Sequence, residues 1–136
     1  MRRLPALAGA LTALLLAGCG LDIQAPDLFL LTRTGPGKKL TLLVNDGGTI
    51  RCDGGKARRL AAPLLLSARD LAASLDADAK RRLRLPVAPD SVYSYVVRLQ
   101  NGTVTFPDTA GSRHSELAQT ELFAVRAAQQ ACGLSG

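Results

Sequence analysis

The chain has 136 residues, of which 47% are hydrophobic and 4% aromatic, and its formal net charge is +6. This length fits one small domain and excludes a multidomain architecture. The basic excess does not indicate nucleic-acid binding, because no aromatic stacking platform lies near the basic residues. The first twenty residues differ in composition from the rest of the chain.

The N-terminal segment has the order of a secretory signal peptide. Met1-Arg2-Arg3 is basic, residues 4–16 are rich in Ala and Leu, and Leu16-Ala17-Gly18-Cys19 follows directly. A basic start, an apolar stretch and a small-residue ending are typical of export signals. The alternative, a transmembrane anchor, is disfavoured because the apolar run has about 13 residues and a spanning helix needs about 20.

Leu16-Ala17-Gly18-Cys19 resembles the lipobox of bacterial lipoproteins, in which the cysteine is acylated, palmitate included, and becomes the first mature residue. The resemblance implies a signal peptide over residues 1–18, a lipidated Cys19 with a tether over 19–26, and a single domain over 27–136. It implies export and a lipid anchor on the outer face of the cell membrane, within the bacterial envelope. The tether reaches at most about 23 Å, so the domain is expected close to the membrane.

Two cysteines remain for a disulfide once Cys19 carries lipid: Cys52 and Cys132. An oxidising compartment favours their pairing, which would stabilise the fold by roughly 4–5 kcal/mol through chain entropy. The alternative is a pair of buried free thiols. These thiols and the single histidine, His114, do not form a zinc ligand set with recognisable spacing, so no metal or cofactor is predicted.

Three strands joined by tight turns are predicted after the tether. Apolar runs mark the strands and glycine-rich turns separate them. The predicted strands cover residues 28–34, 40–45 and 49–52. A three-residue loop over residues 46–48 would place Val44 opposite Ile50 and Leu42 opposite Cys52. Cys52 would then point into the core.

A loop over residues 53–62 and a helix over residues 63–84 are predicted next. Ser67 and Asp70 resemble a capping box near the start of the helix. Leucine and alanine recur every four residues and predict a narrow buried stripe. The stripe consists of Leu71, Leu75, Ala79 and Leu83. Pro86 and Pro89 end the helix.

A hairpin over residues 92–106 is the clearest local signal. Asn101-Gly102 is a strong two-residue turn, and it predicts that Leu99 pairs with Val104 and Val97 with Phe106. A last helix is predicted over residues 112–131.

The last helix is expected to face the sheet with one apolar side, formed by Ala118, Leu122, Val125 and Cys132. Gly133 suits the left-handed position that ends a helix. The resulting order β-β-β-α-β-β-α predicts an α+β fold. In it a five-stranded antiparallel sheet built from hairpins packs against two helices, and one disulfide joins the third strand to the last helix.

No catalytic constellation is apparent, and the chain is predicted not to be an enzyme. His114 is the only histidine, and its neighbour Ser115 would not face it on a helix. No Gly-x-Ser-x-Gly motif is present. Asp76 and Asp78 lie in a polar helix segment. The acids at turns, where acids are usually structural, are Asp46, Asp53, Asp90 and Asp108.

Basic residues gather in two segments and have two interpretations. They suit the C-terminal end of a helix and a solvated face. Alternatively, they form a patch for anionic lipid headgroups or cell-wall polymers, since each charge near such a surface adds up to about 1 kcal/mol. The patch would comprise Lys56, Arg58, Arg59, Lys80, Arg81, Arg82 and Arg84.

The order of several segments resembles the subtilisin-inhibitor-like family of secreted serine-protease inhibitors. The segments are Leu30-Leu31-Thr32, Thr49-Ile50-Arg51-Cys52, Ala68-Arg69-Asp70-Leu71-Ala72, Leu85-Pro86-Val87-Ala88-Pro89 and the hairpin over residues 97–106. The resemblance covers about residues 28 to 108. It implies an extracellular protease as partner and a protease-binding loop made of Arg84, Leu85, Pro86, Val87, Ala88 and Pro89.

The chain departs from this family in its cysteines. Family members usually have a second cysteine where this chain has Ala68, and a further disulfide that braces the protease-binding loop. An inhibitor depends on a preorganised loop, and a shared fold does not carry function with it. The leading expectation is therefore a membrane-anchored, non-enzymatic lipoprotein domain that binds an unknown ligand or another envelope protein. A protease inhibitor and a structural or assembly lipoprotein are the alternatives.

Overall fold

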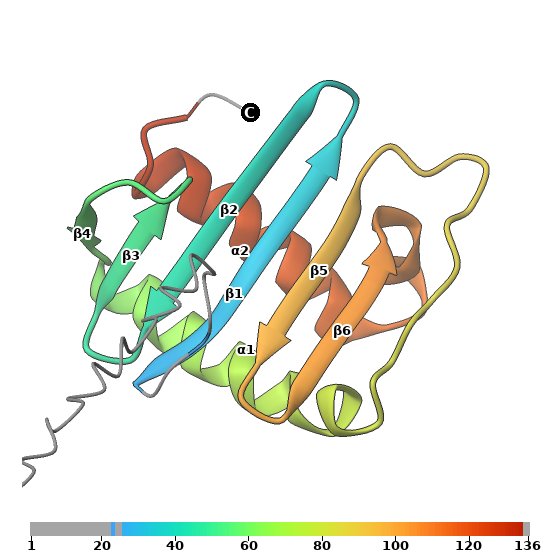
Figure 1. Cartoon of the computed structure of the whole chain (residues 1–136), viewed down its shortest axis with the longest axis horizontal. Coiled ribbons are helices and arrows are strands. Elements are labelled where there is room, and N and C mark those ends of the chain that lie inside the picture. The colour runs from blue at the N-terminus through green and yellow to red at the C-terminus, as the bar shows by residue number, and fades with distance from the viewer. Residues whose placement is uncertain (1–22, 24–25, 135–136) are drawn as a thin grey trace, which may run out of the picture.

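An antiparallel sheet with both long helices on one of its faces forms the body of the protein (Figure 1). The computed structural model describes residue 23 and residues 26–134. The sheet order is β4-β3-β2-β1-β5-β6. Its strands are β1 Asp27–Gly35, β2 Lys38–Asn45, β3 Thr49–Cys52, β4 Ala57–Arg59, β5 Ser94–Leu99 and β6 Gly102–Pro107. The helices are α1 Ala62–Lys80 and α2 Ser115–Gln130, with the 3₁₀ helix η1 Asp108–Ser112 before α2.

The predicted α+β class is confirmed, but the sheet has six strands and the prediction of five is wrong. Strand β4 lies inside the segment predicted as a loop and pairs with β3 through Ile50 and Arg58. All three of its residues are exposed. A strand exposed on both faces carries no alternation of apolar and polar residues, so periodicity could not reveal it.

Strands β2 and β3 have the predicted register. Val44 lies opposite Ile50, and Leu42 lies opposite Cys52. Alternate residues on each strand point toward the helices and form the core. The largest fully buried side chains of the sheet are Phe29, Leu31, Leu42, Val44, Ile50, Val97, Val104 and Phe106.

The hairpin of β5 and β6 is correct in kind, but its predicted register is wrong. Val97 lies opposite Val104, and Leu99 lies opposite Gly102. The pairing has shifted by two residues, and an even shift keeps every side chain on its face, so the buried residues remain as predicted. The shift is caused by contacts between the hairpin and α1. Gly102, whose φ is +153°, packs against the Ala79 backbone, and the Asn101 amide donates to Asp76.

Helix α1 is shorter than predicted and is capped differently. Pro63 lies in its first turn, and Ser67 lies inside the helix, where its hydroxyl donates to the Pro63 carbonyl, so there is no capping box at Ser67. The helix ends at Lys80, Arg82 just beyond it is left-handed with φ +54°, and the Leu83 N–H donates to the Asp78 carbonyl. This is a Schellman ending with Arg in the position usually held by Gly.

Helix α2 buries a different face from the one predicted. Leu122 and Val125 are 40% and 38% exposed. The prediction took its phase from Cys132, which lies beyond the end of the helix and does not follow its periodicity. The buried residues are Leu117, Thr120, Phe123, Ala124, Ala127 and Ala128.

Candidate functional site

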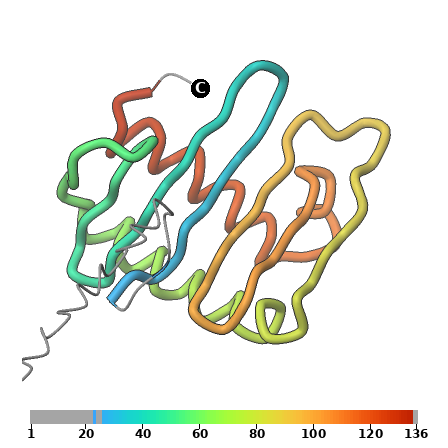
Figure 2. The backbone as a smooth tube through the Cα atoms, viewed as in Figure 1, coloured from blue at the N-terminus to red at the C-terminus, as the bar shows by residue number. Residues whose placement is uncertain are grey.

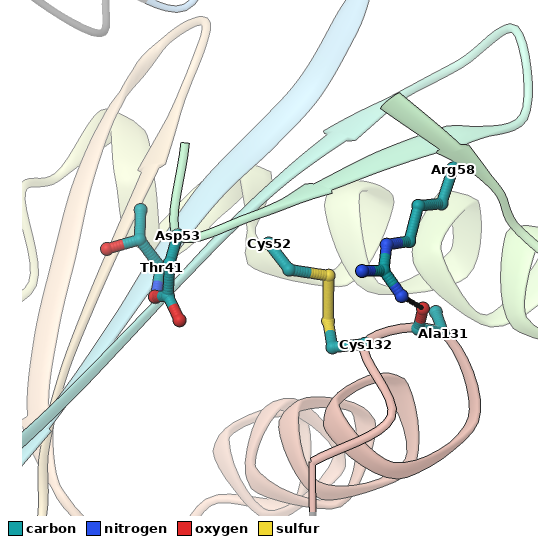
Figure 3. The surroundings of a disulfide bond; sticks show 6 residues. All are labelled: Thr41, Cys52, Asp53, Arg58, Ala131 and Cys132. Atoms are coloured by element: carbon teal, nitrogen blue, oxygen red, sulfur yellow. Dashed lines mark hydrogen bonds between the residues drawn. A yellow bond between two sulfur atoms is a disulfide. The ribbon is translucent and has the colours of Figure 1, made fainter. Parts of the chain in front are cut away.

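The predicted disulfide between Cys52 and Cys132 is present, with its Cα atoms 5.9 Å apart (Figure 3). It joins the last residue of β3 to the turn that follows α2. Gly133 directly after it has a left-handed backbone, φ +66°, as predicted. The disulfide thus fastens the C-terminal end of α2 to the sheet.

Polar contacts reinforce this end of the sheet (Figure 3). The Arg58 guanidinium donates to the Ala131 carbonyl at 3.4 Å. The Thr41 N–H donates to Asp53 Oδ1 at 2.7 Å, and the Asp53 N–H donates to the Thr41 carbonyl. Arg58, predicted to belong to a ligand-binding patch, is therefore engaged in holding β4 to α2.

The structure does not bring the predicted basic patch together. Arg58 and Arg59 belong to β4, the strand at one edge of the sheet. The backbone of Arg84 forms an isolated β-bridge with Thr105 on β6, the strand at the opposite edge of the sheet. Five strand spacings of about 4.8 Å, roughly 24 Å in all, separate the two edges. The seven residues form two separate clusters.

The cluster at the end of α1 is partly neutralised by acidic neighbours. Lys80 Nζ lies 2.7 Å from Asp76, and Arg81 lies 2.7 Å from Asp78. Hydrogen bonds from Lys80 and Asn101 lower the pKa of Asp76 below its ordinary value. Because these cations already pair with acids of the same helix, they fit the interpretation as stabilising charges at the helix end better than the interpretation as a binding patch for an anionic surface.

The predicted protease-binding loop, residues 84–89, is braced on its N-terminal side by β6. The Leu85 N–H donates to the Thr105 carbonyl at 2.9 Å, and the Thr105 N–H donates to the Leu83 carbonyl at 3.0 Å. Leu85 also packs against the hydrophobic core. The chain therefore enters the loop as a short extension of the sheet.

Asp108 braces the other side of the loop. Its carboxylate accepts hydrogen bonds from the Ser91 hydroxyl at 2.8 Å, the Val92 N–H at 3.2 Å and the Tyr93 N–H at 3.1 Å. Burial raises the pKa of Asp108, but these donors and the Thr109 N–H outweigh it and hold the pKa below its ordinary value. Asp108 was interpreted only as a turn acid, and nothing local in the sequence indicated these partners.

The segment between the braces exposes an apolar side chain. Val87, between Pro86 and Pro89, is 71% exposed. The chain then reaches Ser94, which lies opposite Thr34 and Pro107. This end of the sheet also carries the turn between β1 and β2, whereas Asp27 lies at the other end (Figure 2).

A cavity of about 420 Å³ lies at this same end, and the sequence did not indicate it. It is bounded by the turn between β1 and β2, by Tyr93, by Val125 in α2, and by Leu134 in the segment after that helix. Val125 was predicted to lie in the core, whereas in the structure it is exposed and lines this cavity.

His114, the single histidine of the chain, lies beside an acid. Its Nδ1 lies 3.7 Å from Glu116 Oε1, so its neighbour is an acid on the first turn of α2. Among the described residues, no group of three or more His, Cys, Asp or Glu side chains could hold a metal ion. No helix in the described part of the chain is long and apolar enough to cross a membrane.

Comparisons with known proteins give no relative. No family model matches the chain, and neither a curated protein nor a solved structure matches it. The lipobox-like residues and Cys19 lie outside the described residues. Function must therefore be argued from the sequence motif and from the geometry of the domain.

Proposed function

We propose that the chain is a lipid-anchored, non-catalytic binding domain of the bacterial cell envelope. The sequence support is the resemblance of Leu16-Ala17-Gly18-Cys19 to a lipobox, directly after an export-like segment. The structural support is the distance between the two ends of the sheet. β1 begins at Asp27 and has nine residues, which span roughly 30 Å at about 3.4 Å each.

This arrangement suits recognition of a partner away from the membrane. The anchored chain would enter the domain at Asp27, and the exposed Val87 and the 420 Å³ cavity lie toward the other end of the sheet. A domain held on a short tether would then present both features to the outside. This polarity is the observation that carries the proposal.

The test is acylation of the full chain in a bacterial host. Labelled palmitate should be incorporated, and the chain should fractionate with membranes. Cys19→Ser should abolish both, whereas Cys132→Ser, the matched cysteine control, should keep the label. Label retained in Cys19→Ser, or absent from the unaltered chain, would contradict the lipoprotein proposal.

A second function, inhibition of a serine protease, is favoured by the bracing of residues 84–89. The chain lacks the disulfide that braces this loop in the subtilisin-inhibitor-like family. Hydrogen bonds to β6 on one side and to Asp108 on the other brace the loop in its place. A preorganised loop reduces the ordering cost of binding and resists cleavage. Val87, the most exposed large apolar side chain among residues 26–134, would enter the specificity pocket of the protease.

The inhibition test titrates a subtilisin-like protease with membrane vesicles carrying the anchored chain. One-to-one loss of protease activity is expected. Val87→Asp should abolish it, whereas Leu66→Asp should not, because Leu66 is 59% exposed but lies on α1, outside the loop. Rapid cleavage without inhibition, or equal inhibition by both variants, would sink this second function.

A further inference from the structure

The 420 Å³ cavity combines an apolar interior with an excess of cations. Its base includes the buried residues Leu40 and Ala128. Val125 and Leu134 are exposed apolar side chains on its α2 side. The volume lies within the range of small-molecule sites, which are mostly apolar with a few placed polar groups.

Two cations on the helix side of the sheet line the cavity, and they outnumber its one acid. The Arg33 guanidinium lies 4.9 Å from the centre of the Tyr93 ring, in a cation–π contact that holds it at the wall. Lys38 contributes from the start of β2, on the same face as Leu40, whereas the side chain of Lys39 alternates to the other face of the sheet. The acid, Asp53, already accepts a hydrogen bond from the Thr41 N–H at 2.7 Å.

The wall formed by Tyr93 depends on a glycine. A Cβ atom on Gly35 would overlap the Tyr93 ring, so only a glycine at this position lets the ring lie against the turn between β1 and β2. The ring in turn positions Arg33. Backbone and side chains therefore combine to set a cation beside an apolar hollow.

We infer that this cavity binds a small amphiphilic anion, namely a carboxylate with an apolar chain. The apolar chain would lie on Leu40, Val125 and Leu134, and the carboxylate would be paired by Arg33 and Lys38. Pairing a desolvated carboxylate with two cations offsets the cost of burying its charge. The inference goes beyond the anchor and the inhibitory loop, because it uses neither Cys19 nor residues 84–89.

The test uses the full anchored chain in lipid nanodiscs and octanoate as the probe, by titration calorimetry. Empty nanodiscs measure partition of octanoate into lipid. One octanoate per chain is expected above this background, whereas acetate, which lacks the apolar chain, and octylammonium, which has the opposite charge, should bind at least about tenfold more weakly.

A pair of variants on α2 locates the site. Val125→Glu places a carboxylate on the cavity wall and should weaken octanoate binding at least about tenfold through charge repulsion. Leu122→Glu, equally exposed on the same helix but outside the cavity, should bind as the unaltered chain does. No heat above empty nanodiscs, equal loss in both variants, or equal binding of octylammonium would overturn the inference.

Discussion

Gly102 lies so close to the backbone of Ala79 that a Cβ atom at position 102 would overlap the Ala79 carbonyl oxygen. This contact joins the turn between β5 and β6 to the last turn of α1. The Asn101 amide strengthens it by donating to Asp76 at 2.7 Å. The contact also explains the register of the hairpin, since the glycine must stand where the helix passes.

Gly102→Ala should destabilise the domain by roughly 2–3 kcal/mol, because the methyl group forces the helix and the turn apart. Denaturant unfolding measures the loss. Gly37→Ala is the control: Gly37 has φ +66° and no atoms near its would-be Cβ, so it should lose only about 1 kcal/mol through backbone strain. Equal losses would show that the close approach to Ala79 has no energetic weight.

Among the changes considered for this domain, removal of the disulfide should lower the free energy of unfolding the most. The Cys52→Ala and Cys132→Ala double variant loses a link between residues 80 positions apart. Its free energy of unfolding should fall by about 4 kcal/mol on the chain-entropy account. The unaltered protein should lose a similar amount in reducing agent, and an unchanged melting temperature after reduction would contradict this prediction.

The central strands could be predicted because their sequence signals are local, and the disulfide could be predicted because few cysteines are available to form it. Alternating apolar residues and the turn at residues 46–48 set Val44 opposite Ile50, and a pair of thiols left little choice of partner. The exposed β4 gave no such signal. The buried face of α2 was predicted wrongly because Cys132, which lies beyond the end of the helix, was included in the helical periodicity.

The candidate site depends on contacts between distant parts of the chain. Asp108 binds donors 15 to 17 residues earlier, and the cavity joins the turn between β1 and β2 to the end of α2. Single-sequence periodicity contains no information on such pairs. The sequence could indicate residues 84–89 as a candidate loop, but it could not indicate the hydrogen bonds that brace them.

Asp108→Asn should loosen the loop without unfolding the domain. The neutral amide offers one acceptor oxygen in place of two charged ones, so the hydrogen bonds from the Val92 and Tyr93 N–H groups lose their charged acceptor, and about 1–3 kcal/mol of local stability should be lost. Amide hydrogen exchange at Val92 and Tyr93 should accelerate. Asp90→Asn, at an exposed position near the same loop, is the control, and unchanged exchange in Asp108→Asn would show that the carboxylate does not brace the loop.

Glu121 should make stability depend on pH near neutrality. Burial, with a smaller contribution from Asp108, raises its pKa from 4.5 to about 7, and its Oε1 atom is buried without a hydrogen-bond partner. Between these two values the folded state holds a proton that the unfolded state has lost. The stabilisation by this proton is complete below the unfolded pKa and disappears as pH rises through about 7.

The melting temperature should therefore fall between about pH 5 and about pH 8, by an amount equivalent to roughly 1 kcal/mol after solvent screening. Glu121→Gln should remove most of this fall, because the amide stays neutral throughout. Glu116→Gln, at the acid beside His114, is the control and should keep the slope. If Glu121→Gln retains the full slope, another group is responsible for the pH dependence, and the buried Glu121 carboxyl does not titrate in this range.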